Sequence, residues 1–153
     1  MDYNDISCGV AAQAGAVSAD TKEKIHAAID ELFKGGYRRF LIALTGEATL
    51  VFAEAVLSLR EQYPDAGIDL LIPYDGWIES QPEVVRYRQI TAQAESVNES
   101  CEEAYEDSTD ICNHQLIGFG RCMAVIHGGG DKLITELIED AREAEQEVIE
   151  ILI

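Results

Sequence analysis

Short apolar runs alternate with longer segments of helical periodicity along almost the whole chain, and this alternation restricts the fold more than any other feature. Apolar runs with the length of buried strands lie at 6–12, 39–44, 68–72, 122–126 and 148–153, and a more polar candidate strand lies at 96–100. Segments with apolar residues at helical spacing lie at 20–33, 48–59, 84–94, 107–119 and 133–141. Strands joined by helices favour right-handed crossovers and parallel pairing. The sequence therefore predicts an α/β fold: a three-layer, Rossmann-like domain with a mostly parallel, twisted sheet flanked by helices.

The chain reads as one domain over residues 1–153, since it contains no repeat, no low-complexity segment and no Pro- or Gly-rich linker. We expect strands 40–44 and 122–126 to lie centrally, because polar residues interrupt them least. No apolar run of about 18 residues is present, so no membrane span is predicted. The N-terminus, Met1-Asp2-Tyr3-Asn4-Asp5, lacks the basic and apolar segments of a signal peptide. A cytoplasmic location is therefore expected.

The charge balance is strongly acidic. The chain has 11 Lys and Arg against 29 Asp and Glu, which gives a formal net charge of −18. Only Arg38-Arg39 and Arg86 with Arg88 form basic clusters. A field of this sign repels phosphate backbones, so direct binding of DNA or RNA is disfavoured.

The residues that carry common catalytic and metal chemistries are not arranged in their usual patterns. The four cysteines, Cys8, Cys101, Cys112 and Cys122, contain no C-x-x-C pair, so we expect reduced thiols rather than a zinc site. No H-E-x-x-H motif and no Ser-His-Asp or Cys-His order is recognisable. We therefore assign no catalytic residue, no metal ligand and no cofactor.

Ligands of parallel α/β sheets bind at the carboxyl ends of the strands, which directs attention to the loops at 9–17, 45–49, 73–81 and 127–132. The sharpest signal is His127-Gly128-Gly129-Gly130-Asp131, between a predicted strand and a predicted helix. Glycines there let backbone N–H groups approach a phosphate at the helix N-terminus. A flexible turn explains the same pattern, and Asp131 either opposes a phosphate or caps the helix.

Three further positions have more than one interpretation each. Thr45-Gly46-Glu47 is either a helix start, with Thr45 as cap and Glu47 at the positive end of the helix dipole, or a pocket rim where Glu47 accepts from ribose hydroxyls. Glu54 lies among apolar residues and belongs either to a solvated helix face or to the cleft. Trp77, the only tryptophan, is a stacking platform for a base, a lid that packs on the domain, or a dimer contact.

The order of these motifs resembles the SLOG superfamily, in particular its YpsA-like branch. The resemblance extends from about Ile6 to the end and is most specific over 40–59, a strand, the small-residue loop at Thr45-Gly46 and a helix with Ala53-Glu54. It continues through Tyr63-Pro64, Trp77, Arg86-Tyr87, Asn113 and Gly128-Gly129-Gly130. It implies a Rossmann-like domain that binds nucleotides or their derivatives, with Gly9, Glu54 and Asn113 at the cleft. The chain departs from the family pattern at Cys8-Gly9-Val10-Ala11, which keeps only the glycine, at Glu47 and Thr49, and at Asp131.

We expect the protein to bind or sense a nucleotide or a nucleotide-derived small molecule at the carboxyl ends of the strands. One alternative, implied by the resemblance, is a phosphoribohydrolase-like enzyme acting on nucleoside monophosphates. Gly129, Gly130 and Glu136 then have fitting spacing, but Lys132 and Leu133 replace a glycine and a threonine. Another alternative is a degenerate, non-catalytic interaction scaffold, which the missing polar residues and the charge would suit.

Two structural expectations complete the sequence-based hypothesis. Helices 48–59 and 133–141 carry apolar residues beyond one narrow stripe, so we expect a homodimer that covers them. We also expect Gly9, Gly46 and the 128–130 glycines to converge on one edge of the sheet. A β-branched residue at position 129 should then weaken ligand binding and leave the fold intact.

Overall fold

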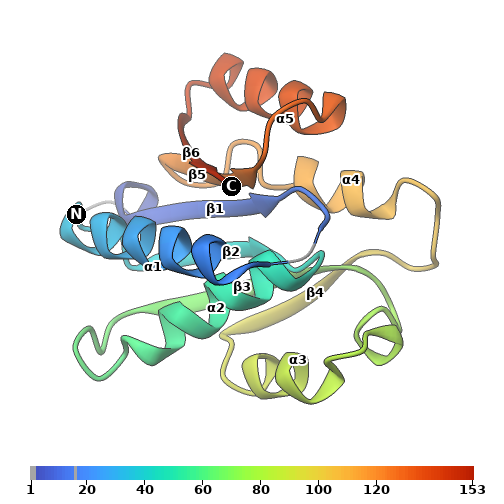
Figure 1. The fold of residues 1–153 in the computed structure, drawn as a ribbon, viewed down its shortest axis with the longest axis horizontal. Coiled ribbons are helices and arrows are strands. Elements are labelled where there is room, and N and C mark those ends of the chain that lie inside the picture. Colours follow the sequence, from blue (N-terminus) through green and yellow to red (C-terminus); the bar gives the residue numbers. More distant parts are fainter. Residues whose placement is uncertain (1–2, 16) are drawn as a thin grey trace.

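The computed structural model describes residues 3–15 and 17–153, and strands and helices alternate through it (Figure 1). The strands are β1 (Ser7–Ala12), β2 (Arg39–Ala43), β3 (Gly67–Tyr74), β4 (Ser96–Cys101), β5 (Cys122–His127) and β6 (Glu147–Leu152). The α-helices are α1 (Ala19–Lys34), α2 (Glu47–Ser58), α3 (Val84–Thr91), α4 (Ser108–His114) and α5 (Lys132–Glu143). The structure also contains two short 3₁₀ helices that we did not predict from the sequence. One, Tyr3–Ile6, precedes β1, and the other, Ile78–Ser80, follows β3.

All six strands form one sheet in the order β4-β3-β2-β1-β5-β6, and every neighbouring pair is parallel. The α/β, Rossmann-like prediction is thus confirmed. β2 is central, as expected, whereas β5 lies next to the edge strand β6, which corrects the expectation that it is central. β1 takes the other central position, with Val10 paired to both Ile42 and Ala124. From β1 to β4, each new strand is added at the same edge of the sheet. The chain then crosses back over β3, β2 and β1, and it adds β5 and β6 on the other side of β1.

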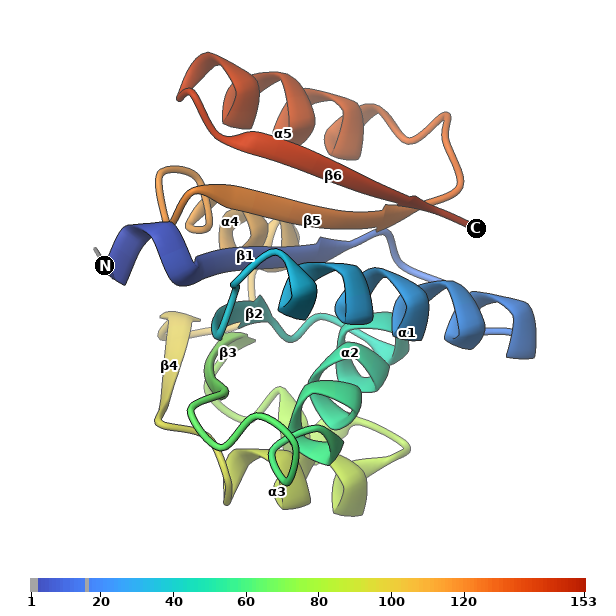
Figure 2. The same cartoon turned by 90° about the vertical axis from the view of Figure 1, so that its left-hand side faces the viewer.

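Helices cover both faces of the sheet, which makes three layers (Figure 2). Residues of α1, α2 and α3 form the larger core with one side of the strands, and α4 and α5 form the smaller core with the other. All residues of β1 and β5 are buried because both of their faces are covered. This burial explains why the sequences of these strands are nearly continuous apolar runs.

Two element ends differ from the sequence prediction. β3 passes through Pro73, where we expected it to stop, because Pro73 lies beyond Leu71, the last residue of β3 that pairs with β2. The missing N–H of the proline therefore opens no gap in that ladder. α4 ends at His114 rather than near residue 119. The chain continues in turns, in which the Ile117 N–H donates to the His114 carbonyl and Gly118 and Gly120 have φ of 83° and 71°. A side chain at Gly120 would also collide with the Ser7 carbonyl oxygen, 2.4 Å from the Cβ position.

The apolar surface of α2 is covered within the chain itself. α2 contacts α1, α3 and the strands, and its residues from Ala48 to Ala53 are buried. The argument for a homodimer from this helix therefore no longer applies, although Leu133 at the start of α5 is 52% exposed. The homodimer remains a prediction, which light scattering checks. Among the described residues, no helix has both the length and the apolar character needed to cross a membrane.

Candidate functional site

The candidate site lies at the carboxyl edge of the sheet, above β1 and β5. β1 leads to α1 on one face of the sheet, and its neighbour β5 leads to α5 on the opposite face (Figure 2). Where neighbouring strands of an open parallel sheet connect in opposite directions, their loops diverge and leave a ligand-binding crevice. We call this place the switch point.

Gln13, directly after β1, bridges the switch point. Its side-chain oxygen accepts a hydrogen bond from the backbone N–H of Gly128 at 3.0 Å. Its own backbone N–H donates to the Ile126 carbonyl at 2.8 Å, which anchors the residue on β5. A polar side chain of the protein therefore occupies the donor that a ligand would use.

The glycine loop, Gly128–Gly130, joins β5 to α5. Gly129 and Gly130 have φ of 85° and 79°, in the region that glycine tolerates and other residues rarely adopt. The N–H of Gly129 donates to His127 Nδ1 at 3.2 Å. An anion that bound the N–H groups of Gly128 and Gly129 would therefore have to displace Gln13 and His127.

Asp131 is the N-cap of α5. Its Oδ1 accepts from the Ile134 N–H at 3.1 Å, so the capping interpretation of this residue is the one realised. The bond satisfies one free donor at the helix start, but it also fixes a negative charge next to the glycine loop. This charge disfavours a highly charged phosphate at α5.

His127, the last residue of β5, connects the glycine loop to the edge strand β6. Its side chain is buried, and Nε2 lies 2.8 Å from the Glu150 carboxylate. Arg142 of α5 donates to the other carboxylate oxygen at 3.3 Å. The hydrogen bond from His127, with the contribution of Arg142, lowers the pKa of Glu150, so this group remains ionised well into the acid range.

The loop after β2 holds the second glycine, Gly46. Gly46, not Thr45, is the N-cap of α2, and no side chain caps this helix, which corrects the capping interpretation. Thr49 instead accepts from the Thr45 N–H at 3.2 Å and donates to the Gly46 carbonyl at 3.1 Å. These bonds close the turn within the chain and leave open space where a Gly46 side chain would stand.

Glu54 and Glu47 share one partner, Arg86 of α3. The Arg86 guanidinium forms two hydrogen bonds with Glu54, at 3.1 and 2.5 Å, and lies 4.0 Å from Glu47. Glu83 is 3.7 Å from the same guanidinium. Glu54 therefore ties α2 to α3 on the outer side of the helices rather than lining the switch point.

Trp77 packs on the domain. Its side chain is 6% exposed and contacts Tyr87 of α3 edge to face, with ring centroids 5.3 Å apart. Burial raises the pKa of Tyr87 to about 12. Of the interpretations expected for Trp77, the geometry matches a residue that packs on the domain, and no ring face is left for stacking a base.

Gly9 does not lie at the carboxyl edge, because it is the third residue of β1, and this corrects the expectation that it converges there with Gly46 and the 128–130 glycines. Gly9 is inside β1, and a Cβ on it would approach the Leu116 side chain to 3.3 Å, so its role is to admit the segment after α4. Asn113 of α4 is 5% exposed, and its Oδ1 has no hydrogen-bond partner among the described residues. Such a buried, unpaired carbonyl is uncommon in proteins.

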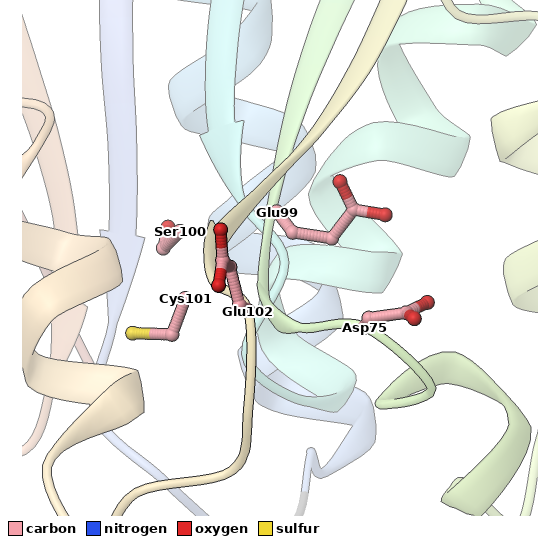
Figure 3. A pocket seen from close by; sticks show the side chains of 5 residues that line it. All are labelled: Asp75, Glu99, Ser100, Cys101 and Glu102. Atoms are coloured by element: carbon pink, nitrogen blue, oxygen red, sulfur yellow. The ribbon is translucent and has the colours of Figure 1, made fainter.

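A cavity that the sequence did not reveal lies at the ends of β3 and β4. It measures about 340 Å³ and is lined by Asp75, Glu99, Ser100, Cys101 and Glu102. Glu99 and Asp75 extend to the same side of the strand end (Figure 3). No Lys or Arg lies between Arg88 and Arg121, which is the sequence signal for this acidic region. The cavity favours cations and repels phosphates.

Within the ranges 3–15 and 17–153, no cluster of three His, Cys, Asp or Glu side chains could hold a metal ion. Glu136, the carboxylate that a phosphoribohydrolase-like reaction would need, is exposed on α5.

Comparison with known proteins identifies no family and no curated protein that matches the chain. Among solved structures, the apo form of the homocysteine methyltransferase MmuM from Escherichia coli is similar, with a TM-score of 0.41 and 12% identity. The similarity covers 94% of this chain and 55% of that chain, so the protein spans about half the length of this structure. A likeness of this degree carries no argument about function.

Proposed function

We propose that the protein binds or senses a nucleotide or a nucleotide-derived small molecule at the switch point between β1 and β5. The observation that carries this proposal is the glycine loop after β5, next to a strand that connects in the opposite direction. Crevices of this kind are the usual ligand sites of open parallel sheets. The resemblance to the SLOG superfamily supports the same proposal from the sequence.

Charge narrows the ligand class. Asp131 caps α5, Glu47 begins α2, and the acidic cavity lies further along the same edge, at the ends of β3 and β4. Negative charges at one edge oppose a chain of phosphates, because each added phosphate increases the repulsion. The proposed ligand is therefore a nucleoside or a nucleotide with few phosphates rather than a triphosphate.

Thermal-shift and calorimetric titrations test the proposal with adenosine, AMP, ATP, ADP-ribose and a cyclic dinucleotide as probes. A ligand of the proposed class raises the melting temperature in proportion to the logarithm of its concentration. AMP or adenosine is expected to bind more tightly than ATP. If none of the probes moves the melting temperature at millimolar concentration, the proposal is wrong.

The internal bonds of the glycine loop favour one second candidate, the non-catalytic scaffold. Gln13 and His127 already satisfy the N–H groups of Gly128 and Gly129. A scaffold needs no ligand and retains these bonds permanently. The variant Gln13→Ala discriminates, because a scaffold binds no probe even when the Gly128 N–H has been freed.

A further inference from the structure

The side chain of His127 holds the glycine loop in place through an acceptor nitrogen. Nδ1 accepts from the Gly129 N–H, so it carries no proton, and the ring proton lies on Nε2, facing the Glu150 carboxylate. The imidazole in this arrangement is neutral. It uses one nitrogen for the loop and the other for β6.

Protonation of the ring affects these two bonds in opposite ways. An imidazolium carries hydrogen on both nitrogens, so Nδ1–H and the Gly129 N–H become two donors that face each other, and this bond is lost. The bond to Glu150 becomes charge-assisted and is strengthened. The ring therefore stays attached to β6 while the loop loses its acceptor.

We propose that protonation of His127 releases Gly129 and opens the glycine loop to an anionic group of the ligand. The freed Gly129 N–H and the new Nδ1–H then point to the same place, and the ring adds a positive charge to an acidic edge. Because the release depends on the protonation of one imidazole, it couples the glycine loop to pH. The ligand half of the inference rests on the proposed function, whereas the release of the loop does not.

The charged groups around His127 come from β6, α5 and α1. Glu150 of β6 keeps its charge because its pKa is lowered by His127, and Arg142 of α5 is always charged. Asp131 caps α5, and Lys24 of α1 lines a cavity that Glu150 also lines. The other histidines lie elsewhere: His26 is exposed on α1, and His114 of α4 lies near Asp110 and Asp140.

Amide hydrogen exchange followed by NMR tests the release in the full chain. Between about pH 7.5 and pH 5.5, the protection of the Gly129 amide, corrected for intrinsic exchange, should fall roughly tenfold, as expected for the loss of one hydrogen bond. The Gly128 amide is an internal control because its acceptor, Gln13, does not titrate. In His127→Asn, whose amide oxygen can take the place of Nδ1, the protection should no longer depend on pH.

Two variants complete the experiment. Glu150→Gln removes the carboxylate that favours the imidazolium, so the transition should move to lower pH, and His26→Asn should leave it unchanged. Protection of Gly129 that does not vary with pH in the wild type, or a transition that persists in His127→Asn, overturns the inference.

Sulfate is a suitable probe for the ligand half, because its charge is constant over this pH range. In the wild type, sulfate should bind more tightly at about pH 5.5 than at pH 7.5. The ratio of the two affinities should roughly equal the fall in protection of the Gly129 amide between these pH values. Equal affinity at both values overturns the link between release and binding. A loop that opens without binding sulfate or any nucleotide supports the release and instead contradicts the proposed function.

Discussion

Gln13 and Gly128 join the two strands at the switch point, because the Gln13 side-chain oxygen accepts a hydrogen bond from the Gly128 N–H at 3.0 Å. The two residues lie far apart in the chain and meet only because β1 and β5 are neighbours. The bond occupies a backbone donor in the place where a Rossmann-like sheet binds its ligand. A ligand that used the Gly128 N–H at this edge would therefore have to compete with a side chain of the protein.

Replacement of Gln13 by alanine should strengthen nucleotide binding. The variant frees the Gly128 N–H, and the ligand no longer displaces a bond worth about 1 kcal/mol, so the affinity should rise roughly fivefold. Calorimetry with AMP measures the change. Gln93→Ala is the control, because Gln93 is an exposed glutamine between α3 and β4 whose side chain forms a hydrogen bond with the backbone, here as donor to the Gln89 carbonyl. Weaker binding in Gln13→Ala would mean that Gln13 contacts the ligand instead of competing with it.

A side chain at Gly46 should block the ligand without disturbing the fold. Gly46 has φ of 169°, an extended conformation open to any residue, and nothing lies within 4 Å of an added Cβ. The free energy of unfolding of Gly46→Val should therefore lie within about 1 kcal/mol of the wild-type value, whereas its affinity for AMP should fall. Urea denaturation and calorimetry check the two parts, and unchanged affinity would show that the ligand does not reach the loop after β2.

Gly129→Val, the variant suggested by the sequence, gives a less clear result. Gly129 has φ of 85°, where a β-branched residue is strained, so the substitution distorts the glycine loop as well as blocking it. The expectation of an intact fold at this position stays a prediction, and the positive φ argues against it. A sequence does not reveal which glycine of a run has a positive φ.

The strands could be predicted because the sheet is parallel and covered on both faces. β1 and β5 are fully buried, so their sequences show no polar alternation and stand out from the helices. The strand order was less accessible, and the position of β1 between β2 and β5 was not expected. Pro73 misled the prediction of the end of β3, because its effect depends on where the neighbouring strand stops.

The sequence allowed us to predict which glycines follow strands at the candidate site, but not which side chains form hydrogen bonds there. Gly46 and the glycine loop follow strands, as their sequence context indicated. The partners Gln13 of Gly128 and Arg86 of Glu54 are set by tertiary contacts between distant segments, which periodicity does not encode. Trp77 was ambiguous for the same reason, since a loop tryptophan is buried only if a helix such as α3 covers it.

Removal of Arg86 should destabilise the contact between α2 and α3. The guanidinium bonds to Glu54 and lies within 4.0 Å of Glu47 and Glu83, so Arg86→Ala removes the positive charge that these three carboxylates share. The ion pair between Arg86 and Glu54 is partly exposed, so we expect its removal to lower the free energy of unfolding by only about 1 kcal/mol. Urea denaturation measures it, with Arg88→Ala on the exposed side of the same helix as control. Equal effects of the two variants would contradict a specific role of Arg86.

The four thiols should differ sharply in reactivity. Cys8, Cys112 and Cys122 are fully buried, and burial raises the pKa of Cys112 to about 11, whereas Cys101 is partly exposed at the acidic cavity. Thiolates are the reactive species, so a thiol reagent at about pH 8 should modify Cys101 first in the native protein. Mass spectrometry of the labelled peptides identifies the site, and labelling in urea gives the total. Fast labelling of Cys112 would show that α4 opens readily.

Asn113→Ala should separate stability from binding. The Asn113 Oδ1 is buried and has no partner among the described residues, and leaving a carbonyl in this state costs about 1–3 kcal/mol. Alanine removes this carbonyl and has a higher helix propensity, by up to about 0.7 kcal/mol. We expect the two gains to exceed the free-energy cost of the small cavity that the shorter side chain leaves. The variant should therefore unfold at a temperature equal to or above that of the wild type.

If Asn113 instead contacts the ligand, as the resemblance implies, the same variant should lose affinity for AMP while it keeps this stability. Calorimetry and thermal unfolding on one preparation distinguish the two roles. A marked loss of stability would mean that Asn113 is a structural residue whose hydrogen bonds support α4.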